Sequence, residues 1–145
     1  MSYNAVKAQE PIDFIQLLHL TDDFYGRPFV LQPWEKGIIQ DIYGTLNDKG
    51  YRQYSYAYLE IPKKNGKTTL IAGLGLYHLM CDGPGGQIYC CAADREQASF
   101  VYHAMHQMID QDEDLQATLK ITDSAKYIEN SKTGTFLKVL SAEAY

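Results

Sequence analysis

The apolar residues of the chain fall into segments whose spacing predicts alternating strands and helices. Residues 54–61 place three tyrosines on one face and mainly aliphatic residues on the other. Both faces are therefore apolar or aromatic, which is typical of a strand covered on both sides within a parallel sheet. Residues 68–80 follow, with apolar residues all around, and predict a mostly buried helix that ends at the Asp-Gly-Pro-Gly-Gly run 82–86.

A second strand and helix come next. Residues 87–93 form a short apolar run that predicts another buried strand, and Asp94 is placed to cap the helix after it. Apolar residues recur at helical spacing up to Ile109, and the acidic stretch 110–114 ends that helix. Farther on, residues 126–130 and 135–140 predict two strands joined by a turn at 131–134. This order predicts an α/β fold with a parallel sheet and right-handed crossovers.

The junction between the first strand and the first of these helices carries the candidate chemistry. Residues 60–69 read Glu-Ile-Pro-Lys-Lys-Asn-Gly-Lys-Thr-Thr, whose end matches the phosphate-binding pattern G-x-x-x-x-G-K-[ST]. In such a loop, backbone N–H groups bind phosphate oxygens, the lysine reaches the terminal phosphates and the hydroxyl ligates Mg²⁺. Ile61 stands where the pattern has its first glycine. The prediction therefore also depends on the flanking strand and helix, because a helix amino end favours an anion. An ordinary strand–turn–helix with a surface lysine is the alternative.

Composition and charge limit the class of protein. The 145 residues suit one domain, of which 46% of residues are apolar. The sequence has no apolar run of ~18 residues and no signal-peptide core near its start, so we expect a cytoplasmic protein. A net charge of −5 argues against a free-standing DNA-binding module.

The cysteines and histidines give weaker signals. Cys81, Cys90 and Cys91 lack the C-x-x-C spacing of metal sites and predict buried free thiols. His103 and His106 lie three residues apart on the second predicted helix, but no third strong ligand accompanies them, which disfavours a metal site.

Four segments together resemble the large subunit of tailed-phage terminases, the ATPase of the DNA-packaging motor: residues 29–39, 62–68, 92–98 and 133–142. The second segment is similar to that family's deviant phosphate loop, which lacks the first glycine and carries a basic residue early. The likeness covers about residues 11–145. It implies a P-loop NTPase-type, three-layer α/β/α fold with a mainly parallel sheet, of which this chain would hold an incomplete part.

The resemblance also implies a division of the chain and a set of binding residues. Residues 1–145 are expected to be the amino-terminal part of the ATPase domain, with lead-in helices and an adenine-side segment in 1–50 and the P-loop core in 51–145. ATP and Mg²⁺ are the implied cofactors. Lys67 is expected to contact the β and γ phosphates, Lys63 to neutralise the γ-phosphate, and both are catalytic candidates, with Lys64 as the alternative to Lys63. The remaining candidates are the cradle residues Asn65, Gly66, Thr68 and Thr69, among which Thr68 would ligate Mg²⁺.

The adenine side departs from the family pattern. Relatives carry a glutamine directly after a tryptophan, whereas here Glu35 follows Trp34. Gln32 could supply the amide that recognises adenine, or the chain could use backbone contacts instead. Gln32 could also merely help an amino-terminal helix pack against the sheet. For Trp34, core packing is the favoured role, because large aromatic side chains mainly contribute buried area.

Hydrolysis of ATP also needs an acidic pair after an apolar strand, one carboxylate for Mg²⁺ and one for the attacking water. Asp94, Glu96, Glu129 and Glu143 do not form such a pair. The family's acidic motif and nuclease domain are therefore expected beyond residue 145, and we expect this chain alone to hydrolyse ATP poorly.

The resemblance implies a part of a motor that couples ATP hydrolysis to translocation of double-stranded DNA into a capsid. The implied partners are double-stranded DNA, the terminase small subunit, the portal protein and further copies of the chain, in the cytoplasm of a bacterial host that carries the phage or prophage. Two alternatives stay open. The chain could belong to another P-loop ATPase of helicase-like or small-molecule-kinase-like type, or it could be a catalytically inactive interaction fragment.

Overall fold

Helices and strands alternate along a computed structural model that describes residues 1–62 and 66–141. The helices are α1 (Ala5–Ile15), α2 (Pro33–Gly44), α3 (Lys67–Cys81), α4 (Arg95–Asp110) and α5 (Glu113–Thr118), with single 3-10 turns η1 (Asp22–Phe24) and η2 (Asp123–Ala125). The strands are β1 (Ser2–Tyr3), β2 (Thr45–Leu46), β3 (Gln87–Ala92), β4 (Leu119–Thr122), β5 (Tyr127–Asn130) and β6 (Phe136–Ser141).

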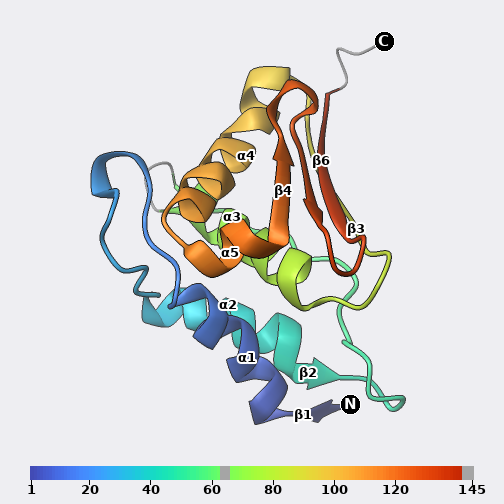
Figure 1. The fold of residues 1–145 in the computed structure, drawn as a ribbon. Coiled ribbons are helices and arrows are strands. Elements are labelled where there is room, and N and C mark those ends of the chain that lie inside the picture. Colours follow the sequence, from blue (N-terminus) through green and yellow to red (C-terminus); the bar gives the residue numbers. More distant parts are fainter. Residues whose placement is uncertain (63–65, 142–145) are drawn as a thin grey trace.

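The main sheet has the strand order β3-β6-β5-β4, and helices α3 and α4 lie against it on one side (Figure 1). Strand β3 pairs in parallel with β6, whereas β4–β5 and β5–β6 pair antiparallel. The expected α/β class is confirmed, and so is the turn at 131–134, where Gly134 has a φ of +76°. The described sheet is mixed rather than mainly parallel, because short turns can join only antiparallel neighbours.

Helix α3 lies at the centre of the molecule. It contacts α1, α4 and the strands β3, β5 and β6. Leu70, Leu76 and Leu79 on this helix have no exposed surface. The sheet also holds α3 by a polar contact, since the buried Asn130 side chain at the end of β5 donates a hydrogen bond of 2.9 Å to the Leu79 carbonyl. The expected buried helix is thus confirmed.

The two lead-in helices α1 and α2 pack against each other below α3 in Figure 1. Asn4 begins α1 by accepting a hydrogen bond from the Lys7 N–H. Pro33 occupies the first position of α2, where the missing N–H costs nothing. Within the described ranges, no helix is long and apolar enough to cross a bilayer.

The segment 54–61 differs from the sequence-based expectation, because the structure has no strand there. The segment has no regular secondary structure and pairs with no strand among the described residues. Tyr56 and Tyr58 are 95% and 87% exposed instead of covered. The prediction of a doubly covered strand is wrong for this structure, since an alternating aromatic pattern needs a hydrogen-bonding neighbour before it becomes a strand.

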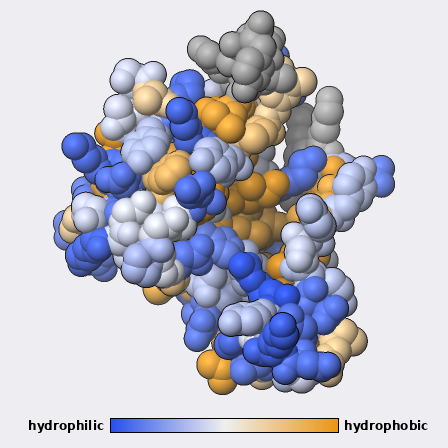
Figure 2. Space-filling view, turned by 90° about the vertical axis from the view of Figure 1, so that its right-hand side faces the viewer, coloured by the Kyte–Doolittle hydropathy of each residue, from blue (hydrophilic) through white to orange (hydrophobic). Residues whose placement is uncertain are grey.

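Strand β3 is confirmed, but its expected burial on both faces is wrong. Ile88 and Cys90 face the helices, whereas Tyr89 and Cys91 face solvent, because the described helices cover only one side of the sheet. Figure 2 looks onto the side of the molecule where β3 and β6 lie and shows apolar surface gathered in a hollow at its centre. Cys81 is exposed as well, so the prediction of buried thiols holds only in part, for Cys90, whose burial raises its pKa to about 11.

The contact between Asn130 and helix α3 predicts a measurable loss of stability. Asn130→Ala removes the donor to Leu79 and the acceptor for the Lys132 N–H, so the free energy of unfolding should fall by about 1–3 kcal/mol. Urea unfolding followed by circular dichroism measures it. Lys120→Ala, at an exposed position of the same sheet, is the control, and equal midpoints for the two variants would contradict the role given to Asn130.

Candidate functional site

The amino end of α3 has the backbone shape of an anion-binding turn. Gly66 is the residue just before the helix and has φ +77° and ψ +18°, a left-handed conformation that glycine adopts with little strain. Lys67 and Thr68 occupy the first two helical positions, and both are exposed. The Thr69 hydroxyl donates a 2.9 Å hydrogen bond to the Gly66 carbonyl and so fixes the turn. Free N–H groups and an adjacent lysine at a helix amino end favour a phosphate.

The described part of the loop brings together four of the predicted site residues, 66–69. The predicted residues Lys63, Lys64 and Asn65 lie outside the described residues.

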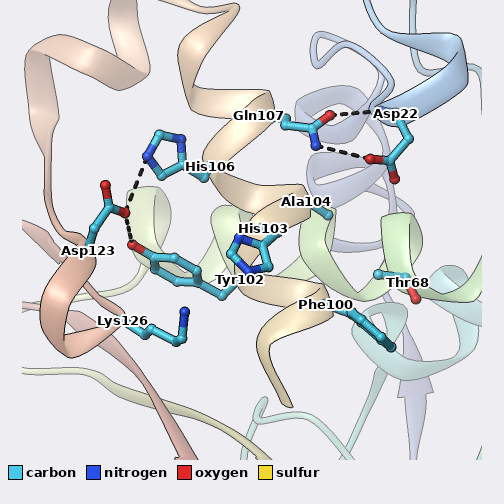
Figure 3. Close-up of a pocket in the computed structure, with 10 residues that line it drawn as sticks. All are labelled: Asp22, Thr68, Phe100, Tyr102, His103, Ala104, His106, Gln107, Asp123 and Lys126. Atoms are coloured by element: carbon cyan, nitrogen blue, oxygen red, sulfur yellow. Dashed lines mark hydrogen bonds and ion pairs between the residues drawn. The ribbon is translucent and has the colours of Figure 1, made fainter. Parts of the chain in front are cut away.

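A cavity of about 780 Å³ opens beside this turn (Figure 3). Its volume is within the range of small-molecule sites. Thr68 lines one end, the exposed face of α4 forms a long side, and residues from η1 and η2 contribute to the lining (Figure 3). Among the predicted site residues, Thr68 alone appears in its described lining, which consists of Asp22, Thr68, Phe100, Tyr102, His103, Ala104, His106, Gln107, Asp123 and Lys126.

A cluster of polar side chains ties α4 to η2 within this cavity. The Tyr102 hydroxyl donates a short hydrogen bond to Asp123 Oδ1, and His106 Nε2 lies 3.4 Å from the same oxygen (Figure 3). His106 Nδ1 lies 3.0 Å from Asp110 Oδ2. The Lys126 ammonium lies 5.4 Å from the centre of the Tyr102 ring. The His106 ring forms ion pairs with both carboxylates whenever it is protonated. We refer to His106, Asp110 and Asp123 together as the clasp.

Contacts within this cluster raise the pKa of His106 and lower the pKa of Asp123. Burial of the His106 ring lowers its pKa, but Asp110 and Asp123 more than offset this, so that the net pKa is raised. The Tyr102 hydroxyl bond, followed by the charge of His106, lowers the pKa of Asp123. Both shifts favour the ion pair, and the sequence signal for it was only the i,i+4 spacing of His106 and Asp110.

The adenine-side residues take structural positions at the start of α2. Gln32 precedes the helix, and its N–H donates a 2.8 Å hydrogen bond to Oε1 of the buried Glu35. The Gln32 side chain is exposed and is not among the described residues that line the cavity. Trp34 is 41% exposed, so its expected role in the core is wrong, because the buried side of α2 carries Glu35 and Ile39 instead.

A second polar group lies at the other end of α3, and its only sequence signal was the i,i+4 spacing of His78 and Asp82. The Tyr43 hydroxyl and His78 Nε2 are 2.7 Å apart, and His78 Nδ1 lies 2.9 Å from Asp82 Oδ1. Arg52 lies over the Tyr43 ring, and a cavity of about 260 Å³ adjoins the group. These residues join α2 to the carboxyl end of α3, away from the turn at Gly66.

The clasp at His106 predicts a pH-dependent contribution to stability. Because the folded-state pKa of His106 is raised, its contribution is complete below its ordinary pKa of 6.5 and is lost as pH rises through the folded-state value. The lowered pKa of Asp123 has the opposite pH dependence, because its contribution is lost as pH falls through its folded-state value. The pair therefore contributes to stability between the folded-state pKa of Asp123 and that of His106. His106→Gln should therefore cost more unfolding free energy at about pH 6 than at about pH 8.5.

Thermal or urea unfolding at the two pH values measures this difference. His103→Gln is the matched control, because His103 is exposed on the same helix and contacts the ring of Tyr102 rather than a carboxylate in the described structure. A pH-independent difference between wild type and His106→Gln would contradict the clasp.

Comparisons with known proteins agree on one family. Residues 33–144 match the family described as Terminase large subunit, ATPase domain. The terminase large subunit of Enterobacteria phage HK97 is 38% identical over 122 residues, which cover 81% of this chain and 23% of that protein. The crystal structure of the HK97 bacteriophage large terminase superposes with a TM-score of 0.81 at 32% identity, covering 99% of this chain and 28% of that one. The chain thus spans about a quarter of the length of these relatives, and it belongs to the family of terminase large-subunit ATPase domains.

Proposed function

We propose that this chain binds Mg–ATP at the amino end of α3 and serves as the nucleotide-binding part of a phage DNA-packaging ATPase. One observation carries the proposal: Gly66 adopts a left-handed conformation directly before α3, with Lys67 and Thr68 exposed at its first two positions. This turn lies inside the range that matches the family. It also adjoins a cavity large enough for a nucleotide.

The residues of the turn fit a triphosphate and its metal ion. Lys67 would contact the β and γ phosphates, and the Thr68 hydroxyl would ligate Mg²⁺, an ion that accepts oxygen ligands. When bound, the metal ion would neutralise charge on the triphosphate. The backbone from Asn65 to Thr69 would cradle the phosphates.

Two assignments farther from the turn complete the proposed site. Lys63 would neutralise charge on the γ-phosphate, with Lys64 as the alternative. Gln32 has an exposed side chain at the start of α2 and would present its amide to the adenine edge.

We further propose that the carboxylate pair for hydrolysis comes from outside this chain. Asp94 caps α4 through the Glu96 N–H, and Glu129 accepts a hydrogen bond from the Tyr127 hydroxyl. These carboxylates therefore have structural partners, and the chain spans 23% of the HK97 terminase large subunit. By itself it should turn over ATP slowly, since phosphoryl transfer requires several charged groups at once.

Within the complete motor we propose the setting that its family implies. ATP hydrolysis would drive double-stranded DNA into a capsid, in contact with a terminase small subunit and a portal protein. This would take place in the cytoplasm of the bacterial host, with a nuclease domain following the ATPase domain.

The role of Lys67 is tested by isothermal titration calorimetry with Mg–ATP. Lys67→Ala should weaken binding by roughly a hundredfold or more, because it removes a charge-assisted contact to the triphosphate. Lys49→Ala, at an exposed turn near β2, is the control and should bind like wild type. Equal affinities for Lys67→Ala and wild type would disprove the proposed nucleotide site.

Association between copies of this chain is a separate prediction. The exposed tyrosines Tyr56 and Tyr58 and the uncovered sheet residues Tyr89 and Leu140 offer apolar surface, which favours self-association. Light scattering after size exclusion should show a mass that rises with protein concentration. A constant monomer mass up to the solubility limit would contradict it.

A further inference from the structure

The connection between α1 and α2 contains a loop in an unusual conformation. His19 and Pro28 form an isolated antiparallel bridge that closes the loop, and the Leu20 N–H donates to the Arg27 carbonyl at 2.8 Å. At its tip, Asp22 has a φ of +54°. This left-handed region is uncommon for residues other than glycine, although aspartate and asparagine tolerate it better than most. Contacts with another part of the structure can offset the cost of this conformation.

Two glutamines hold this loop, Gln107 on α4 and Gln111 directly after the last residue of that helix. The Asp22 N–H donates to Gln107 Oε1 at 2.7 Å, and Gln107 Nε2 donates to Asp22 Oδ1 at 3.0 Å. The Gly26 N–H donates to Gln111 Oε1 at 2.8 Å, and Gln111 Nε2 donates to the Leu20 carbonyl at 2.9 Å. Each amide thus uses its donor and its acceptor on the same loop, which fixes the loop against α4 at two points.

The contact nearer the phosphate-binding turn also forms part of the cavity. Asp22 and Gln107 line the cavity that Thr68 lines, and Figure 3 shows their paired hydrogen bonds at its upper end. Gln111 and Gly26 are not among its described lining residues. The loop therefore contributes Asp22 to the wall of the cavity, and the Gln107 side chain joins Asp22 to α4.

We propose that Gln107 is a positioning residue for nucleotide binding, which holds Asp22 and the loop in the place where the cavity can accept a nucleoside triphosphate. The proposal rests on the function proposed above, that Mg–ATP binds at the amino end of α3. Gln107 acts through Asp22 and needs no contact of its own with the nucleotide. A glutamine suits the task because it satisfies a backbone donor and a carboxylate acceptor of one residue at the same time.

The test exchanges donor and acceptor in the hydrogen bond between the side chains of Gln107 and Asp22. Gln107→Glu replaces the Nε2 donor with an oxygen that faces the Asp22 carboxylate, and the two like charges should displace the loop. Mg–ATP affinity measured by calorimetry should fall by about tenfold, the change that corresponds to one hydrogen bond with a charged partner.

Adding Asp22→Asn to Gln107→Glu should restore the contact with its polarity reversed. The asparagine amide then donates to the new carboxylate, the backbone N–H keeps its acceptor, and asparagine tolerates the left-handed φ. Affinity should return to within about twofold of wild type, and the Asp22→Asn single variant completes the double-mutant cycle.

A matched control and a second measurement separate positioning from general stability. Gln116→Glu alters a glutamine of α5 whose amide donates to the carbonyls of Ile109 and Asp110, so it should lower stability and leave affinity unchanged. Hydrogen exchange of residues 20–27 should quicken in Gln107→Glu and slow again in the double variant.

The outcomes distinguish the two proposals. Wild-type affinity in Gln107→Glu, while Lys67→Ala has lost binding, would overturn the role of Gln107 and leave the nucleotide site in place. A double variant with slow hydrogen exchange but weak Mg–ATP binding would also overturn the role of Gln107. In that case the charge of Asp22, and not the position of the loop, would determine the affinity. A wild-type chain without affinity for Mg–ATP would refute both proposals.

Discussion

The burial of helix α3 is the constraint on which the rest of the structure depends. Leu70, Leu76 and Leu79 are fully buried between α1, α4 and the sheet, and each contributes about 1.5–3 kcal/mol through the removal of apolar surface from water. A helix buried along most of its length cannot turn or slide without losing these contacts. Its first turn, with Lys67 and Thr68, is therefore held in a fixed exposed position by residues that have no part in binding.

Two glycines allow the neighbouring helices to approach α3 closely. A Cβ at Gly73 would come within 3.2 Å of Ile15 on α1, and a Cβ at Gly75 would overlap the tip of Met105 on α4. The short distance between α3 and α4 brings the exposed face of α4 beside Thr68, and the cavity lies there. The packing of these residues, some two turns farther along α3, thus contributes to the placement of α4 beside Thr68.

Short sequence patterns correctly predicted those elements that depend on residues adjacent in the chain. The start of α3 after Gly66, the cap of α4 at Asp94 and the turn before β6 follow from short-range rules and are present. The strand at 54–61 and the two-sided burial of β3 depended on neighbours that no local pattern specifies, and both predictions were wrong. The cavity wall was beyond prediction for the same reason, since Asp22 and Gln107 are 85 residues apart.

The overall charge is −5, and the carboxylates of the cavity have hydrogen-bonding partners. Asp123 is bonded to Tyr102 and paired with His106, and Asp22 accepts from the Gln107 amide. Charges several ångströms apart interact by only about 1 kcal/mol in water, and salt screens them further. Groups within hydrogen-bonding distance therefore govern the local electrostatics of this cavity more than the net charge of the chain does.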